Sequence, residues 1–173
     1  MRMESVLIIH DLDTEQAQYL FSDLNHVEIL SSHRKIVPCV GCYCCWVKTP
    51  GSCIYHDGIE TIGRKKSTYN NLIIVSKIFY GGYSPSIKNI IDRSISTSLP
   101  SFTFRNREMH HVLRFKNRCN LKVYFYSYDD RKISQDERDI AHDIVTANSV
   151  NWGCLKHETF FATNLNELKE VLK

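Results

Sequence analysis

Short runs of consecutive apolar residues recur along the chain and are separated by longer segments of mixed polarity. The clearest runs are Val6–Ile9 and Leu72–Val75. Such runs are typical of strands that are buried on both faces of a parallel sheet. The same reasoning predicts further strands later in the chain, which gives five: residues 6–9, 27–30, 72–75, 121–126 and 155–161.

Helix-start signals precede the segments between these strands. Asp13 and Ser134 are each followed three residues later by Gln or Glu, which is the pattern of a capping box. Ser84 precedes Pro85, a residue that favours the first helical position. The predicted helices begin at Asp13, Asp57, Ser84, Ser134 and Asn164, and the second of them runs to about Tyr69. Residues 97–117 show no clean period and predict no regular element.

Strands that alternate with helices predict an α/β fold with helices on both faces of a five-stranded parallel sheet. We expect one flavodoxin-like domain over residues 1–173, a three-layer sandwich with strand order 2-1-3-4-5. Ligands of such sheets bind outside the carboxyl ends of the strands, where the strand order reverses. The segments predicted to lie there are 10–13, 76–84 and 127–133.

Composition narrows the function classes. Apolar residues make up 43% of the chain and charged residues 24%, which is the balance of a globular domain. The net charge of +3 is too small, and the basic residues too scattered, to indicate nucleic acid as a partner. The start of the chain has no apolar segment long enough for export or a membrane span, so we expect a cytoplasmic protein without a membrane partner.

Two segments carry a more specific pattern. One runs from Cys39 to Cys53 and reads Cys-Trp-Val-Lys-Thr-Pro-Gly from Cys45 onward. The other runs from Ser76 to Ser84 as Ser-Lys-Ile-Phe-Tyr-Gly-Gly-Tyr-Ser, with Lys88 and Asp92-Arg93 after it. Together they resemble the flavodoxin-like NADPH-dependent FMN reductase family, especially the branch that includes the iron-sulfur flavoproteins. The resemblance spans nearly the whole chain.

This resemblance implies a homodimeric or homotetrameric flavoprotein. In it FMN would take electrons from NAD(P)H and pass them to a small-molecule or protein acceptor. Segment 76–84 is similar to the family's loop over the flavin ring, and its glycines and aromatics suit a flat ligand. A plain turn whose aromatics pack on a neighbouring subunit is the alternative. The predicted FMN contacts are His10, Thr14, Ser76, Ile78, Phe79, Tyr80, Gly81, Gly82, Ser84 and Tyr128. No residue is identified as a general acid or base.

The first loop departs from the family pattern. Family members carry small hydroxyl, amide and glycine residues there to hold the FMN phosphate, whereas this chain has His-Asp-Leu-Asp-Thr-Glu at residues 10–15. Three carboxylates would repel a phosphate, and Asp13 as a helix cap would occupy amides that the phosphate needs. Only His10 and Thr14 remain as phosphate donors. The alternative function is therefore a flavodoxin-like scaffold that has lost FMN and binds partners or oligomerises.

The cysteines allow three interpretations. Cys39, Cys42, Cys45 and Cys53 have the spacing C-x2-C-x2-C-x7-C, compact enough for four thiolates to hold one iron-sulfur cluster. Four thiolates would also satisfy zinc. In the third interpretation they are free or partly disulfide-bonded structural cysteines. The other three, Cys44, Cys119 and Cys154, are interpreted as core thiols.

Two neighbouring pairs receive structural interpretations. His110 and His111 are adjacent, so their side chains diverge and do not easily share a metal. We expect them to cap the active site or to lie at a subunit contact. Asp92 and Arg93 are interpreted as a structural pair at the end of a helix.

Overall fold

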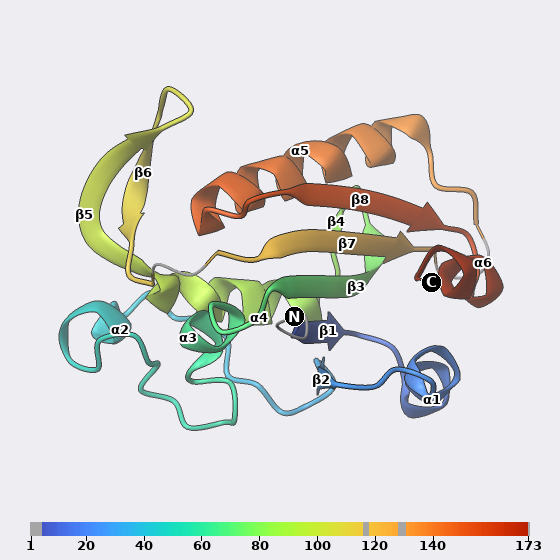
Figure 1. The fold of residues 1–173 in the computed structure, drawn as a ribbon, viewed down its shortest axis with the longest axis horizontal. Coiled ribbons are helices and arrows are strands. Elements are labelled where there is room, and N and C mark those ends of the chain that lie inside the picture. Colours follow the sequence, from blue (N-terminus) through green and yellow to red (C-terminus); the bar gives the residue numbers. More distant parts are fainter. Residues whose placement is uncertain (1–4, 116–117, 128–130, 173) are drawn as a thin grey trace.

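A central parallel sheet organises the molecule (Figure 1). The computed structural model describes residues 5–115, 118–127 and 131–172. Its strands are β1 (Val6–His10), β2 (Val27–Ser31), β3 (Asn71–Phe79), β4 (Gly82–Tyr83), β5 (Ser98–Arg105), β6 (Glu108–Leu113), β7 (Asn120–Tyr126) and β8 (His157–Ala162). Its helices are α1 (Thr14–Phe21), α2 (Cys44–Val47), α3 (Ile62–Lys66), α4 (Pro85–Arg93), α5 (Gln135–Trp152) and α6 (Leu165–Leu172), with a 3-10 turn η1 (Ser94–Thr97) after α4.

The strand order confirms the predicted topology. The main path is β2-β1-β3-β7-β8, and all of its pairings are parallel. Because β7 and β8 are the fourth and fifth predicted strands, this order is the predicted 2-1-3-4-5. The short β4 pairs with the end of β3 and adds a sixth strand that the sequence pattern did not predict. The order reverses between β1 and β3, which is the switch point of this class of sheet.

Alternate residues along the strands divide the core into two layers. Leu7 and Ile9 of β1 belong to the cluster that packs against α3, α4 and α5. Ile8, between them, belongs to the second cluster, which includes residues of α1 and α6. The period of two explains why each strand reads as a continuous apolar run. The result is a three-layer sandwich. Within the described residues, no helix is long and apolar enough to cross a membrane.

Most predicted helix starts are confirmed. Asp13 and Ser134 form capping boxes with Gln16 and Glu137, and the Ser84 side chain accepts a hydrogen bond from the backbone N–H of Ile87. Asn164 accepts from the backbone N–H of Glu167 at 3.0 Å. The prediction for Asp57 is wrong. Helix α3 spans only Ile62–Lys66, and the Asp57 carboxylate binds a buried arginine instead of capping a helix.

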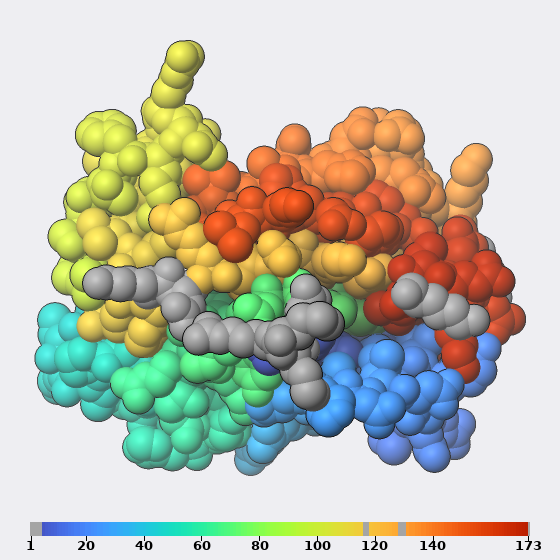
Figure 2. Space-filling view, viewed as in Figure 1, coloured from blue at the N-terminus to red at the C-terminus, as the bar shows by residue number. Residues whose placement is uncertain are grey.

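Residues 98–113 form an antiparallel hairpin where the sequence predicted no element. Strands β5 and β6 are joined by Asn106 and Arg107, which both have positive φ, of 51° and 67°. Two consecutive positive φ angles define the turn that matches strand twist in tight hairpins. The hairpin pairs only with itself, and its tip stands away from the body of the molecule (Figure 2). Its pattern was missed because no residue of β5 is fully buried, so no apolar run marks it.

Candidate cofactor sites

The first candidate site lies at the carboxyl ends of β1, β3 and β7, where Asp11 forms a buried polar network. Its carboxylate accepts the backbone N–H of Lys77 at 3.0 and 3.2 Å and the hydroxyl of Tyr126 at 3.0 Å. Burial raises the pKa of Asp11, and hydrogen bonds from Ser84, Lys77 and Tyr126 oppose that rise. The carboxyl group therefore fastens the ends of three elements together. Its oxygens thus accept hydrogen bonds that stabilise the fold.

The neighbouring polar groups of the first loop are also committed. Asp13 accepts the backbone N–H of Gln16 at 2.8 Å, which satisfies a free amide at the start of α1. Burial, with a smaller contribution from His33, lowers the pKa of His10 to about 4, so its ring is neutral at neutral pH. His10 and Thr14 line an open pocket of about 330 Å³ with Asp13 and His33, and no lysine or arginine of the described chain lines it. The first loop therefore does not fit a phosphate dianion.

Tyr80 and Gly81 form the turn between β3 and β4. Their φ angles are 48° and 80°, and the strands pair on both sides of them. A Cβ on Gly81 would lie 2.7 Å from the Cβ of Ile140 in α5, so glycine is required for both the turn and the close approach. Tyr80 is 90% exposed. A large ring held on a strained turn at the carboxyl edge is a feature that the fold itself does not require.

The other predicted flavin contacts are mostly buried. Ser76 and Ile78 have no exposed surface, and Ile78 belongs to the larger core cluster. The Ser76 hydroxyl accepts the backbone N–H of Ser84 at 2.9 Å, which closes the loop. Phe79 is partly exposed, and Gly82 is half-buried beside it. Tyr128 lies outside the described residues. Ser76 and Ile78 therefore offer no accessible surface to a ligand, whereas Tyr80 could offer its side chain.

The second candidate site is a pocket in the cysteine-rich loop. Its volume is about 70 Å³, well below the roughly 300 Å³ at which pockets for organic ligands begin. It is lined by Cys39, Val40, Gly41, Cys42, Tyr43, Cys45, Cys53, Tyr55, Arg93 and Ile95. The four cysteines with the compact spacing thus share one pocket, while Cys44 does not line it. All seven cysteines are free thiols.

The arrangement of these thiols bears on which group could bind. Zinc at about 2.3 Å from each sulfur would hold tetrahedral ligands roughly 3.8 Å apart. No three metal-ligating side chains of the described chain are arranged to hold a single metal ion. A cluster of several iron and sulfide ions is larger than one ion, so its ligands lie farther apart. The thiols of the described chain are therefore not arranged as a tetrahedral zinc site.

The thiols of this pocket influence one another. Burial raises the pKa of Cys45, and the nearby Cys53, Cys39 and Cys42 raise it further. The pKa of Cys42 is lowered, because it accepts hydrogen bonds from the backbone N–H and then the thiol of Cys44.

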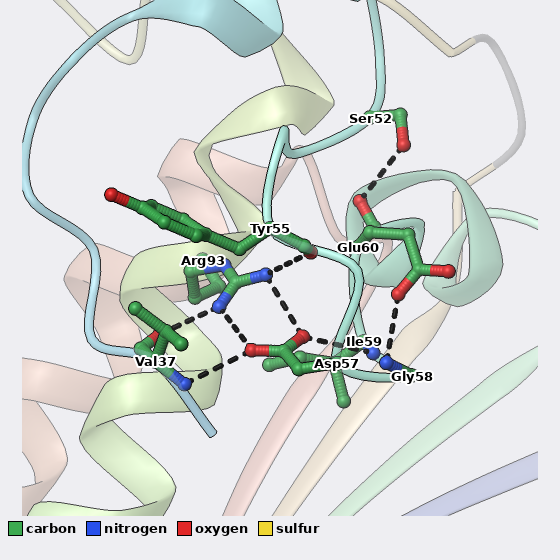
Figure 3. A network of polar contacts seen from close by, with 8 residues as sticks. All are labelled: Val37, Ser52, Tyr55, Asp57, Gly58, Ile59, Glu60 and Arg93. Carbon is green, nitrogen blue, oxygen red and sulfur yellow. Dashed lines mark hydrogen bonds and ion pairs between the residues drawn. The ribbon is translucent and has the colours of Figure 1, made fainter. Parts of the chain in front are cut away.

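Arg93 holds both ends of the cysteine loop (Figure 3). It is only 2% exposed. Its guanidinium forms a two-pronged ion pair with Asp57 at 2.7 and 3.0 Å, and it donates to the backbone carbonyls of Val37 at 2.6 Å and Tyr55 at 3.1 Å. Burial alone would lower the pKa of Arg93, but hydrogen bonding to Asp57 and the nearby Cys53 raise it. The predicted pairing of Asp92 with Arg93 is wrong, because Asp92 pairs with Lys88 on the helix surface.

Aromatic residues join the cysteine loop to the β5–β6 hairpin. The centroid of the His111 ring lies 4.8 Å from that of the Trp46 ring and 4.6 Å from that of the Phe102 ring. The Trp46 indole N–H also donates to the carbonyl of Ile95 at 3.3 Å. His110 instead bonds Asn151 and Glu108. The two histidines diverge as predicted. Sequence reasoning missed the role of His111 because its partners lie in other elements.

The two candidate sites lie at opposite ends of the sheet. In Figure 1 the arrowheads of β1, β3, β7 and β8 point toward the side of α1 and α6. The helices α2 and α3 and the hairpin lie at the other side, where the strands begin. Asp11 and Tyr80 therefore mark one end of the molecule, and the cysteine pocket marks the other.

Fold and site together define a doubly wound flavodoxin-like domain, and solved structures share this fold. An FMN-dependent NADH-azoreductase from Bacillus anthracis in complex with FMN aligns with a TM-score of 0.59 and 16% identity, over 98% of this chain and 97% of that chain. An NAD(P)H:quinone oxidoreductase from Methanothermobacter marburgensis aligns with a TM-score of 0.63 and 10% identity, over 98% and 94% of the two chains. These identities show the fold and not the activity.

Sequence similarity to curated proteins covers a shorter segment. An iron-sulfur flavoprotein of Methanocaldococcus jannaschii is 31% identical over 74 residues, 43% of this chain and 37% of that protein. An iron-sulfur flavoprotein of Methanosarcina thermophila is 23% identical over 79 residues, 46% of this chain and 40% of that protein. The matched segments therefore span about two fifths of these relatives. No protein-family model matches the chain.

Proposed function

We propose that this protein is an FMN-binding oxidoreductase or electron-transfer protein that accepts electrons from NAD(P)H. The observation that carries the proposal is the Tyr80-Gly81 turn, which presents an exposed ring at the switch point of a doubly wound sheet. Such switch points bind ligands in open α/β sheets. The similarity in fold to FMN-dependent reductases and in sequence to iron-sulfur flavoproteins supports the same class.

In this proposal the flavin is held mainly by its ring. Tyr80 would stack on the ring, and the backbone of residues 79–82 would lie at its polar edge. Bound FMN would supply hydride acceptance and one-electron release. The phosphate end is a poor fit, because Asp11 and Asp13 are acidic and His10 is neutral. We expect the protein to discriminate only weakly between FMN and its unphosphorylated form, riboflavin.

The cysteine pocket belongs to the same proposal as the site of an iron-sulfur cluster. Cys39, Cys42, Cys45 and Cys53 are its ligands, and Arg93 keeps the loop closed around it. A cluster extends the redox function to one-electron transfer with a small-molecule or protein acceptor.

A homodimer or homotetramer and a cytoplasmic location complete the proposal. The hairpin exposes Phe102, Phe104 and Met109, which gives an apolar surface for a second copy of the chain. Seven free thiols favour a reducing compartment. Light scattering of the purified protein tests the assembly, and a monomer would contradict it.

The decisive experiment is an anaerobic visible absorption spectrum, followed by acid release of the chromophore. The proposal predicts that the purified protein shows a two-band flavin spectrum that NAD(P)H bleaches. If the protein is purified without flavin, it should take up added FMN and then show this spectrum. The Tyr80→Gly variant should bind flavin more weakly, whereas the exposed control Tyr19→Gly on α1 should not.

One observation favours a second candidate, a scaffold that has lost FMN. In the first loop, the carboxylates of Asp11 and Asp13 accept hydrogen bonds from the protein itself. This candidate predicts a colourless protein that takes up neither FMN nor riboflavin. The same spectrum therefore separates the two functions.

A further inference from the structure

Cys119 and Cys154 form a thiol pair that lines neither candidate cofactor pocket. Cys119 directly precedes β7, and Cys154 lies shortly before β8. Their sulfur atoms are 4.0 Å apart. The pocket beside Cys119 shares no lining residue with the pocket of the four loop cysteines. The pair also lies at the starts of the strands, opposite to the end that carries Tyr80 (Figure 1).

The backbone around this pair is compatible with a disulfide. The backbone N–H of Leu155 donates to the carbonyl of Cys119 at 3.1 Å, so the two segments run as neighbours before the parallel pairing of β7 with β8. Neighbouring strands lie about 4.8 Å apart, within the roughly 4.4–6.8 Å over which disulfides join Cα atoms. The sulfurs must close from 4.0 Å to the roughly 2.05 Å of a disulfide bond, which the close approach of the two segments favours.

A buried lysine faces the pair. Lys66, the last residue of α3, is 3% exposed, and its ammonium lies 4.2 Å from the centre of the Trp152 ring. Lys66 and Cys119 line one small pocket together with Ser67, Thr97, Phe115 and Trp152. A charged ammonium in the interior requires a compensating negative group. The thiols are the nearby groups that can become negative.

The pKa values of Lys66, Cys119 and Cys154 depend on one another. Burial lowers the pKa of Lys66 to about 7, and the charges of Cys154 and Cys119 oppose that change. The pKa of Cys119 is lowered, first by a hydrogen bond from the Cys154 thiol and then by Lys66. The pKa of Cys154 is raised, because its proton is held in that hydrogen bond. Because Cys119 lines the pocket with Lys66 and Cys154 does not, Cys119 is the nucleophilic partner.

We infer that Cys119 and Cys154 are an oxidisable dithiol site that reacts with small hydroperoxides, with Lys66 as the positioning cation. The Cys119 thiolate attacks one peroxide oxygen, the O–O bond breaks, and water or an alcohol leaves after taking a proton. The sulfur of Cys154 then attacks the sulfenic acid of Cys119; the S–S bond forms, the S–O bond breaks, and the thiol proton leaves in water. Two sulfurs are oxidised and the peroxide accepts both electrons.

The site differs from an ordinary contact between core thiols in one respect. Two buried thiols without a nearby cation would be unreactive, because burial disfavours the thiolate. The narrow pocket selects hydrogen peroxide over bulky hydroperoxides, because Cys119 is only 5% exposed. The inference does not depend on the proposed flavin or cluster.

The test is oxidation of the reduced full-length protein by a small excess of hydrogen peroxide at pH 7. Free thiols are blocked at intervals, and peptides are mapped by mass spectrometry. We expect the peptides containing Cys119 and Cys154 to become linked, with a bulky hydroperoxide reacting more slowly. In Cys154→Ser, a sulfenic acid at Cys119 should accumulate and be captured by dimedone.

A matched pair of lysine variants tests the cation. Lys66→Met keeps an apolar stem of similar length, and it should slow oxidation of Cys119 by about three- to tenfold as the thiol returns toward its ordinary pKa. Lys65→Met is the control, because the Lys65 ammonium pairs with Glu28 instead. The inference is overturned if Cys119 and Cys154 stay unlinked while other cysteines oxidise. Equal rates for the two lysine variants would also overturn it.

Discussion

The first loop, residues 10–14, and the cysteine loop, residues 39–53, use their reactive side chains in opposite ways. In the first loop, Asp11 and Asp13 are engaged by backbone amides, and the His10 ring is neutral. In the cysteine loop, four thiols line a pocket and a separate group, Arg93, holds the loop in place. The difference is that the carboxylates of the first loop hold the fold together themselves, whereas Arg93 holds the cysteine loop and leaves the thiols to line the pocket.

The largest effect should come from removing the support of the cysteine loop. Arg93→Met leaves the Asp57 carboxylate without its partner in a nearly buried position. We expect a loss of about 3–5 kcal/mol in the free energy of unfolding, measured by urea denaturation. Asp92→Asn breaks only the exposed pair with Lys88 and should cost less than about 1 kcal/mol. Equal losses in the two variants would contradict the assignment of Arg93 as the anchor.

The next effect concerns His10 and acid. The unfolded histidine takes up a proton near pH 6.5 and the folded one only near pH 4. Between these values the unfolded state binds more protons, so stability must fall as the pH is lowered through this window. The loss due to His10 is up to about 3 kcal/mol. This loss should be absent in His10→Asn, so the stability difference between the wild type and the variant should change between pH 7 and pH 4 in urea denaturation. A parallel pH dependence of the two proteins would show that His10 is not neutral in the fold.

A smaller effect is expected on flavin selectivity. Asp11→Asn removes a negative charge near the proposed phosphate position and retains an acceptor for the Lys77 amide. FMN should bind about fivefold more tightly, from roughly 1 kcal/mol of relieved repulsion, with riboflavin unchanged. Calorimetric titration measures both. Asp23→Asn, an exposed change beyond α1, is the control; a gain for riboflavin as well would indicate a change in shape and not in charge.

The smallest effect concerns the strained turn. Tyr80 has a φ of 48°, which costs a residue other than glycine roughly 1 kcal/mol. Tyr80→Gly should therefore stabilise the protein by about 1 kcal/mol in thermal unfolding while weakening flavin binding. Gly81→Ala should destabilise it, because the added Cβ meets Ile140. A loss of stability in Tyr80→Gly would mean that the ring packs on the protein itself.

The sheet could be predicted from the sequence because the signals for its strands and helices lie within a few residues of each other. Apolar runs such as Leu72–Val75 and caps such as Asp13 and Ser84 act within a few residues, and the strand order follows from the alternation of elements. The cysteine spacing likewise predicted which four thiols share a pocket. In contrast, Arg93 joins Asp57, which is 36 positions away, and no local pattern marks such a pair.

Other misses have the same origin. The hairpin of β5 and β6 lacks a buried face over its outer half, so its period carries no signal. That the acidic first loop is unsuited to phosphate stays a prediction. Its structural role was not foreseeable, because the partners of Asp11 are Lys77 and Tyr126 on other strands.

The most direct test of the central claim is the iron and acid-labile sulfide content after anaerobic reconstitution with ferrous iron and sulfide. The wild type and Cys44→Ser should bind both in equal amounts, because Cys44 does not line the pocket. Cys45→Ser should lose both, because it removes a buried pocket thiol. A wild type that binds no iron, or a Cys45→Ser variant that binds as much as Cys44→Ser, would contradict the account.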